Sequence, residues 1–177
     1  GEMKFSVLMS LYIKEKVEYA EACFESLLRQ TVLADEWVIV EDGTLTEEMY
    51  LLLARYQDKY PGLIKRVPFE TNRGLGFALR DGVEACTHDL IARMDTDDIA
   101  REDRFEKHLA MFEADNSLDI CGSHIKEFDG SIENVISQRI VPTADTEIKA
   151  YQKRRDAFNH MTVMYKKNAV LKAGNYQ

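Results

Sequence analysis

Short apolar runs alternate with longer amphipathic stretches over the first half of the chain, and this alternation constrains the fold more than any other feature. The runs have the length of buried strands, and the stretches between them repeat apolar residues at helical spacing. Strands that alternate with helices in this way form a mostly parallel central sheet, with helices on both faces. We therefore predict an α/β fold with strands at residues 5–9, 37–40, 64–69 and 90–94, and with helices at 17–30, at 46–60 and ending near residue 86.

The second half of the chain is patterned less regularly and is interpreted as an extension of the same sheet. Strands are expected at residues 118–122 and 161–165, and helices at 101–114, 145–155 and 167–173. The Asp129-Gly130 pair between them is a hairpin signal. Because the 177 residues show no repeat or linker, we predict a single domain over residues 1–177. Gly1 and Glu2 are interpreted as the remnant of a tag.

Charge and cysteine usage narrow the class of protein. With 23 basic and 31 acidic residues, the formal net charge of −8 argues against a nucleic-acid partner, which requires a basic surface. Cys23, Cys86 and Cys121 are widely spaced in apolar stretches, so we expect three buried thiols in a reducing compartment. No apolar run approaches the roughly 18 residues of a membrane span, and no signal peptide opens the chain. These features predict a cytoplasmic protein.

The fourth apolar run ends in Arg93-Met94-Asp95-Thr96-Asp97-Asp98, which places three carboxylates within four residues. Unpaired carboxylates are too costly to bury, so the cluster must face water or a cation. The alternate residues Asp95 and Asp97 suit Mg2+ or Mn2+ bound together with a diphosphate. An acidic turn, with Asp98 favouring the start of the next helix, is the alternative. His160 is a candidate third metal or phosphate ligand, and a structural histidine is the alternative there.

Polar loops also follow the first three predicted strands. In parallel sheets ligands bind at the carboxyl ends of the strands, so these loops should meet the acidic cluster at one site. Tyr12 can stack on a base that Ser10 hydrogen-bonds, or its ring can simply pack. Asp42 can accept the imino N–H of uracil, or only form a turn. The loop from Asn72 through Gly74 leads into a helix N-terminus, which suits a diphosphate.

Six motifs, taken in order along the chain, resemble those of the family 2 glycosyltransferases, which have the Rossmann-like GT-A nucleotide-diphospho-sugar transferase fold. Within that family the chain most resembles the bacterial exopolysaccharide enzymes of the amylovoran-biosynthesis type, and the resemblance covers almost the whole chain. The motifs are residues 5–12 (FSVLMSLY), Glu41-Asp42-Gly43, Asn72-Arg73-Gly74, residues 94–98 (MDTDD), residues 103–107 (DRFEK) and residues 158–164 (FNHMTVM).

The resemblance implies an inverting, metal-dependent transferase with Mg2+ or Mn2+ as cofactor. Its donor would be a nucleotide-diphosphate sugar, expected to be a UDP-sugar, and its acceptor a glycan or a lipid-linked saccharide in bacterial polysaccharide biosynthesis. Peripheral attachment to the inner face of the membrane is an open alternative to a free cytoplasmic location. Carried over by position, Ser10, Tyr12 and Asp42 would hold the nucleobase, and Asn72 and Gly74 would lie beside the nucleotide. Asp95 would hold the ribose, and Asp97 the metal. Asp98 and His160 are further candidate metal ligands.

Two departures from the family pattern limit what the resemblance implies. The turn Glu41-Asp42-Gly43-Thr44 replaces an Asp-Asp-Gly-Ser-like turn and keeps its second acid. The family's catalytic base follows a Gly-Gly-Tyr-like element, which residues 173–177 match before the chain stops at Gln177. We therefore expect the base to lie beyond Gln177, in a C-terminal part of the native catalytic domain that is absent. The chain is then expected to bind donor but to transfer sugar poorly.

Two other functions use similar residues. A non-catalytic nucleotide-sugar binding module would use the carboxylates for affinity alone. A sugar nucleotidyltransferase also combines metal and phosphates on an α/β sheet. That class normally opens with a glycine-rich basic loop after the first strand, where residues 10–14 contain no glycine. The sequence therefore favours a glycosyltransferase.

Overall fold

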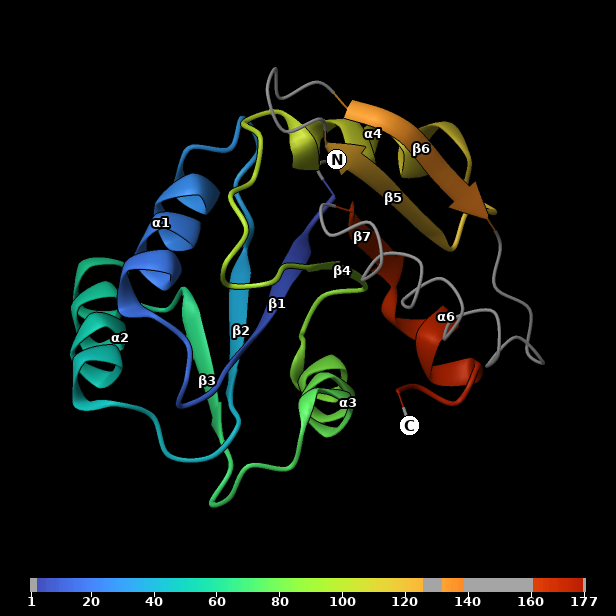
Figure 1. The fold of residues 1–177 in the computed structure, drawn as a ribbon. Coiled ribbons are helices and arrows are strands. Elements are labelled where there is room, and N and C mark those ends of the chain that lie inside the picture. The colour runs from blue at the N-terminus through green and yellow to red at the C-terminus, as the bar shows by residue number, and fades with distance from the viewer. Residues whose placement is uncertain (1–2, 126–131, 139–160, 177) are drawn as a thin grey trace.

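The computed structural model describes residues 3–125, 132–138 and 161–176. Its strands form one seven-stranded sheet in the order β3-β2-β1-β4-β7-β5-β6, shown in Figure 1. The strands are β1 (Phe5–Leu11), β2 (Glu36–Glu41), β3 (Ile64–Pro68), β4 (Leu90–Arg93), β5 (Ile120–Ile125), β6 (Ile132–Gln138) and β7 (Met161–Lys166). The helices are α1 (Val17–Leu28), α2 (Glu47–Lys59), α3 (Leu75–Ala85), α4 (Arg104–Ala114) and α6 (Lys167–Lys172).

The sheet has a parallel part and an antiparallel part. β1 pairs in parallel with β2 and β4, and β2 pairs in parallel with β3. β7 is antiparallel to β4 and to β5, and β6 is antiparallel to β5. Five strands, β1 to β5, therefore run in one direction, which confirms the predicted α/β fold with a mostly parallel sheet. The antiparallel pairs come from the second half of the chain, where the sequence is patterned less regularly.

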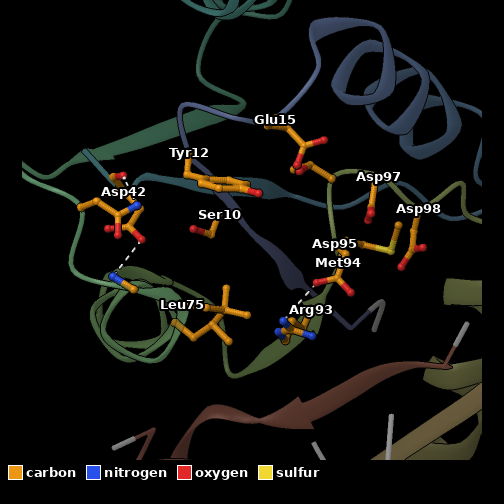
Figure 2. Close-up of a pocket in the computed structure, with 14 residues that line it drawn as sticks. Ser10, Tyr12, Glu15, Asp42, Leu75, Arg93, Met94, Asp95, Asp97 and Asp98 are labelled. Carbon is orange, nitrogen blue, oxygen red and sulfur yellow. Dashed lines mark hydrogen bonds and ion pairs between the residues drawn. The ribbon is translucent and has the colours of Figure 1, made fainter. Parts of the chain in front are cut away.

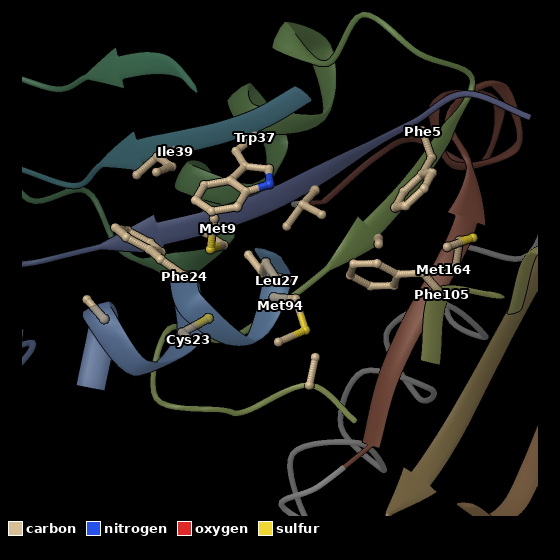
Figure 3. Close-up of a cluster of buried hydrophobic side chains, with 14 of the residues drawn as sticks. Phe5, Met9, Cys23, Phe24, Leu27, Trp37, Ile39, Met94, Phe105 and Met164 are labelled. Carbon is tan, nitrogen blue, oxygen red and sulfur yellow. The ribbon is translucent and has the colours of Figure 1, made fainter. Parts of the chain in front are cut away.

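Helices cover both faces of the sheet, as predicted (Figure 1). α1, α2 and α4 share one core with the inward side chains of β1, β2 and β4. In that core Trp37 packs against Phe24 with ring centroids 5.4 Å apart, and Phe5 packs edge-on against Phe105 at 5.0 Å (Figure 3). α3 and α6 share the second core with the opposite face of the same strands. The central strands β1, β2 and β4 are mostly apolar because both of their faces are covered.

The start of α4 differs from the prediction. The periodicity predicts a helix from Arg101, but α4 begins at Arg104. The carbonyl of Arg101 accepts from Gln30 Nε2 at 2.6 Å, and the carbonyl of Glu102 accepts from the Thr31 N–H at 2.8 Å. Because these carbonyls bond to Gln30 and Thr31, just after the end of α1, residues 101–103 form a turn that docks on the segment following α1 instead of a first helical turn.

Several further predictions can be compared with the structure. Cys23, Cys86 and Cys121 are free and buried, as predicted. β5 and β6 pair in antiparallel fashion, but the Asp129-Gly130 pair between them lies outside the described residues, as does the helix predicted at 145–155. Within the described ranges, no helix is both long enough and apolar enough to cross a membrane.

Candidate functional site

A pocket of about 500 Å3 lies at the carboxyl ends of β1, β2 and β4 (Figure 2). The chain passes from β1 to β2 and β3 on one side and then returns to β4 on the other side of β1. The loops after β1 and β4 therefore diverge, and open α/β sheets bind ligands at such a crevice. Nearly all of the predicted site residues line this pocket: Ser10, Tyr12, Asp42, Asn72, Gly74, Asp95, Asp97 and Asp98.

Two of the predictions about the site fall on residues that the structure does not describe. His160, the candidate third metal or phosphate ligand, lies outside the described residues. So does Gln177, the last residue of the chain, beyond which the catalytic base is expected. The role of His160 and the position of the base therefore stay predictions.

The loop from Asp95 to Asp98 forms one side of the pocket, here called the acidic wall. One carboxylate oxygen of each of Asp95, Asp97 and Asp98 lies within 4.8 Å of the other two. A turn in which the Asp98 N–H donates to the Asp95 carbonyl at 3.0 Å brings them together. Asp97 is exposed, and Asp95 and Asp98 are half-buried. Hard carboxylate oxygens at this spacing fit Mg2+ or Mn2+, so these residues can hold a divalent cation.

Helix α1 supports the acidic wall from behind. The Cys23 thiol donates to the Asp95 carbonyl at 3.8 Å, and the Ser26 hydroxyl accepts from the Ala100 N–H at 3.0 Å. Gln30, which is buried, bonds the turn before α4 and accepts from the Phe105 N–H at 3.1 Å. These contacts are made to the backbone of residues 95–105, so they hold the loop that carries the aspartates.

Two basic side chains of α4 are buried behind the acidic wall. Arg104 donates from Nη1 to the Met94 sulfur at 3.3 Å. Burial lowers the pKa of Arg104 to about 10, and the negative charge of Asp98 opposes that shift. Burial, with the charge of Arg104, lowers the pKa of His108 to about 3. Arg104 is therefore a cation close to Asp98, whereas His108 is neutral over the physiological pH range.

Asp42, Asn72 and Gly74 form the opposite side of the pocket, here called the α3 wall. Asp42 is buried, and its two carboxylate oxygens accept from the backbone N–H groups of Arg73 at 2.6 Å and Gly74 at 3.0 Å. Asn72 Nδ2 donates to the Asp42 carbonyl at 3.2 Å. Asp42 thus fixes the loop that leads into α3, a structural use that the sequence suggested only as a turn.

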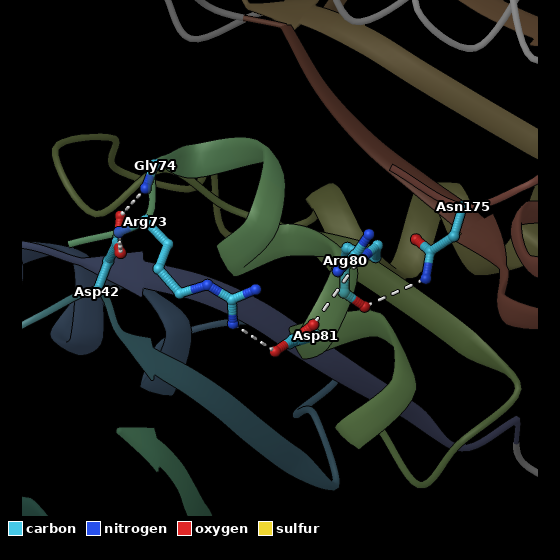
Figure 4. A network of polar contacts seen from close by, with 6 residues as sticks. All are labelled: Asp42, Arg73, Gly74, Arg80, Asp81 and Asn175. Carbon is cyan, nitrogen blue, oxygen red and sulfur yellow. Dashed lines mark hydrogen bonds and ion pairs between the residues drawn. The ribbon is translucent and has the colours of Figure 1, made fainter. Parts of the chain in front are cut away.

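Gly43 permits this close approach of the two loops. Its φ is +91°, and a Cβ at this position would lie 2.8 Å from the backbone nitrogen of Asn72. The Arg73 side chain points away along α3, where it stacks on Phe69 and Phe77 with its guanidinium carbon 5.0 and 4.6 Å from the ring centroids. It also pairs with Asp81 at 3.4 Å (Figure 4). The Arg73 side chain is therefore held on the surface of α3.

Ser10, Tyr12 and Glu15 lie between the two walls (Figure 2). Ser10 is half-buried at the end of β1, and the Tyr12 side chain is 43% exposed. Glu15 lines the pocket but was not predicted as a site residue. Burial raises the pKa of Glu15, its hydrogen bond to the Thr96 side chain opposes the rise, and the charges of Asp97 and Asp95 add to it. The sequence signal that could have identified Glu15 as a site residue was its position in the polar stretch after the first strand.

Arg93 is a second pocket residue that the sequence reasoning did not assign. It ends β4 and lies beside Asp95 in Figure 2, with its Nη2 atom 3.0 Å from Asp95 Oδ1. Leu75 and Leu79 of α3 supply the apolar part of the lining. The signal for Arg93 was a charged residue at the end of an apolar run, directly before the acidic residues.

Comparison with known proteins identifies the family. Residues 6–173 match the profile described as glycosyl transferase family 2. The chain is 46% identical over 175 residues to an uncharacterized glycosyltransferase of Haemophilus influenzae, covering 99% of this chain and 65% of that protein. It is 42% identical over 173 residues to the amylovoran biosynthesis glycosyltransferase AmsE of Erwinia amylovora, covering 98% and 64%.

A third relative is named for a specific reaction. The UDP-Gal:alpha-D-GlcNAc-diphosphoundecaprenol beta-1,3-galactosyltransferase of Escherichia coli is 36% identical over 173 residues, covering 98% of this chain and 62% of that protein. The chain therefore spans between 62% and 65% of the length of these three relatives.

Two solved structures share the fold. The TarS 1–349 structure of S. aureus superposes with a TM-score of 0.69 at 20% identity, covering 98% of this chain and 50% of that one. The mannosyltransferase PcManGT of Pyrobaculum calidifontis, solved with GDP-Man and Mn2+, superposes with a TM-score of 0.61 at 19% identity, covering 70% and 36%. The resemblance predicted from the motifs is confirmed: the chain belongs to glycosyl transferase family 2 and has the GT-A fold.

Proposed function

We propose that this chain is the donor-binding domain of a metal-dependent, inverting glycosyltransferase that uses a nucleotide-diphosphate sugar. The observation that carries the proposal is the acidic wall, whose three carboxylates converge within 4.8 Å at the edge of a pocket of about 500 Å3. The pocket volume is within the range of small-molecule sites. Its position at the switch between β1 and β4 is where an α/β sheet binds a nucleotide.

Each lining residue has a proposed role that suits its position. Tyr12 offers an exposed ring for stacking on the nucleobase, and Ser10 a hydroxyl beside it. The two carboxylate oxygens of Asp42 already accept N–H groups, so we propose that Asp42 acts on the base mainly by fixing the α3 wall, with Asn72 and Gly74 beside the nucleotide. Asp95 would hold the ribose, and Asp97 and Asp98 the metal.

The chemistry follows from these roles. Mg2+ or Mn2+ held by Asp97 and Asp98 would act as a Lewis acid for the departing diphosphate. Cys23 and Ser26 of α1 bond the backbone of the loop and so hold in place the segment that carries the carboxylates. Inversion requires a base that deprotonates the acceptor hydroxyl for in-line attack. We assign no residue of this chain to that step, and the base stays predicted beyond Gln177.

The relatives support a UDP-sugar donor and a lipid-linked or glycan acceptor in bacterial polysaccharide synthesis. The E. coli relative is named for UDP-Gal and a lipid diphosphate acceptor, and AmsE for amylovoran biosynthesis. We propose the cytoplasm, or the cytoplasmic face of the membrane, as the place of action, because three buried free thiols suit a reducing compartment. Membership of the family supports sugar transfer over the nucleotidyltransferase and binding-module alternatives.

Calorimetric titration with UDP tests the proposal, with GDP for comparison, each with and without Mn2+. We expect UDP to bind in a Mn2+-dependent manner and Asp97→Ala to reduce its affinity at least tenfold, because the cation loses an exposed ligand of the acidic wall. The matched control is Asp58→Ala, which removes an exposed aspartate of α2. Failure of UDP and GDP to bind under any of these conditions would contradict the proposal, as would UDP binding that Asp97→Ala leaves unchanged.

A further inference from the structure

Arg93 is a buried cation in direct contact with the acidic wall. Only 2% of its surface is exposed, and it pairs with Asp95 at 3.0 Å (Figure 2). Its Nε and Nη1 atoms have no hydrogen-bond partner among the described residues. A guanidinium stays protonated even when it is buried. A fixed positive charge is therefore present at the acidic wall, on Asp95, next to the two carboxylates that are proposed to hold a metal.

Arg93 is the one cationic side chain among the described residues that line the pocket. Behind Asp98, the buried Arg104 adds a second positive charge outside the lining. The lining carries five carboxyl groups, those of Glu15, Asp42, Asp95, Asp97 and Asp98. The acidic wall is consequently less negative than its three aspartates suggest.

These contacts have opposite consequences for a cation and for an anion. Arg93 repels a divalent ion that approaches the acidic wall alone, and it attracts the negative charge of a diphosphate. It also holds Asp95 through the ion pair, which fixes one carboxylate of the wall before any ligand arrives. A wall with this counter-charge therefore favours a cation that arrives together with an anionic ligand.

Building on the proposed function, we propose that Arg93 is a positioning residue of the donor site: it orients Asp95 and makes the acidic wall bind a divalent cation together with a nucleoside diphosphate rather than alone. The side chain acts through Asp95 and through its charge. The proposal predicts opposite changes in the affinities for free cation and for nucleotide when the charge is removed.

Two substitutions test this. Arg93→Met removes the charge and keeps an unbranched side chain, and we expect Mn2+ alone to bind about tenfold more tightly and UDP at saturating Mn2+ about tenfold more weakly. Arg93→Lys keeps the charge but not the planar guanidinium, so Mn2+ affinity should stay near that of the unmodified protein while UDP affinity falls. Calorimetry gives both affinities, and thermal unfolding checks that each variant is folded. If Arg93→Met does not fold, the Mn2+ and UDP affinities of Arg93→Lys still test the proposal.

The control is Arg80→Met, which removes an equal charge from a half-buried arginine of α3 outside the pocket lining. It should leave both affinities within about twofold, because solvent screens its charge. Affinities for Mn2+ and UDP that fall together in Arg93→Met, or that do not change, would overturn the inference. So would an Arg93→Lys variant whose Mn2+ affinity rises about tenfold, or whose UDP affinity does not fall. If the unmodified protein binds neither Mn2+ nor UDP, the proposed function itself fails. If it binds both but Arg93→Met does not change the two affinities in opposite directions, only the inference about Arg93 fails.

Discussion

The two sides of the pocket hold their carboxylates in opposite ways. On the α3 wall, both oxygens of Asp42 accept backbone N–H groups, so the side chain joins two loops. On the acidic wall, α1 bonds the backbone of the loop, and the carboxylates of Asp95, Asp97 and Asp98 converge on one another. The first arrangement stabilises the fold through charge-assisted hydrogen bonds. The second brings like charges together, a repulsion that Arg93 and Arg104 reduce and that a bound cation would reduce further.

The difference shows why the position of an aspartate at a strand end does not by itself decide its use. Asp42 and Asp97 both follow buried strands, and both were predicted as site residues. Their burial separates them, because Asp42 is 4% exposed and Asp97 is exposed. A buried carboxylate must have partners within the protein, whereas an exposed one can await a ligand. The same residue type therefore supports the fold on one wall and is available to a ligand on the other.

The largest expected effect is that of Asp42→Ala. The substitution removes the acceptor of two backbone N–H bonds, and charge-assisted bonds of this kind contribute roughly 1.5–3 kcal/mol each. We expect the free energy of unfolding to fall by about 3 kcal/mol, and by about half as much in Asp42→Asn, which keeps one acceptor oxygen. Urea unfolding followed by circular dichroism measures both changes.

Asp97→Ala provides the contrast for that measurement. It removes an exposed carboxylate that lies near two others, so we expect the free energy of unfolding to change by less than about 0.5 kcal/mol. The comparison between the two walls would break down if Asp97→Ala destabilised the protein as much as Asp42→Ala.

A smaller effect is expected from Gln30→Leu, which tests the support of the acidic wall. The substitution conserves volume approximately but leaves the Arg101 carbonyl and the Phe105 N–H without their partner. We expect a loss of about 2 kcal/mol in the free energy of unfolding, and weaker Mn2+-dependent UDP binding. The control is Gln57→Leu on α2, which is half-buried and does not touch the acidic wall. Equal losses in the two variants would show that Gln30 has no special role in holding the loop.

The fold was largely predictable because its strands and helices bury apolar faces at regular intervals. β2 extends one residue beyond the predicted run at each end, and α2 begins after Thr46, whose side chain accepts from the Met49 N–H at 3.2 Å. The start of α4 was wrong because tertiary hydrogen bonds to Gln30 and Thr31 outweigh local helical periodicity there. Such contacts join residues far apart in the sequence and leave no local pattern.

The site was predictable only in part, for a related reason. The rule that ligands bind at the carboxyl ends of parallel strands was enough to gather the loops. It could not reveal Glu15, which joins the site through a hydrogen bond to the Thr96 side chain, a residue 81 positions away in the sequence. Nor could it reveal Arg93, because a charged residue at a strand end is usually solvated, and its burial follows from how β4 sits against its neighbours. Residue type predicted the acidic wall, and only packing identified its counter-charge.

The smallest expected effect concerns pH and distinguishes the back of the acidic wall from the α3 wall. The pKa of His108 is about 3 in the folded protein, against about 6.5 when the side chain is exposed. The unfolded chain therefore binds a proton that the folded protein does not, so this stabilisation is complete above pH 6.5 and is lost as the pH falls toward 3. From this group alone we expect the free energy of unfolding to drop by about 1 kcal/mol between about pH 7 and about pH 5.5.

His108→Gln should remove that part of the pH dependence, whatever it does to stability at neutral pH. Urea unfolding at several pH values between about 5 and 7 gives the slope for the unmodified protein and for the variant. The same substitution at His88, a half-buried histidine before β4, serves as the control. Equal slopes in the unmodified protein and His108→Gln would mean that α4 admits a proton at this position, and that the support of the acidic wall is less tightly packed than the burial of His108 indicates. A slope reduced only in His108→Gln would identify α4 as the acid-sensitive support of the acidic wall. The α3 wall should not share this pH dependence, because Asp42 has no histidine among its hydrogen-bond partners in the described part of the chain.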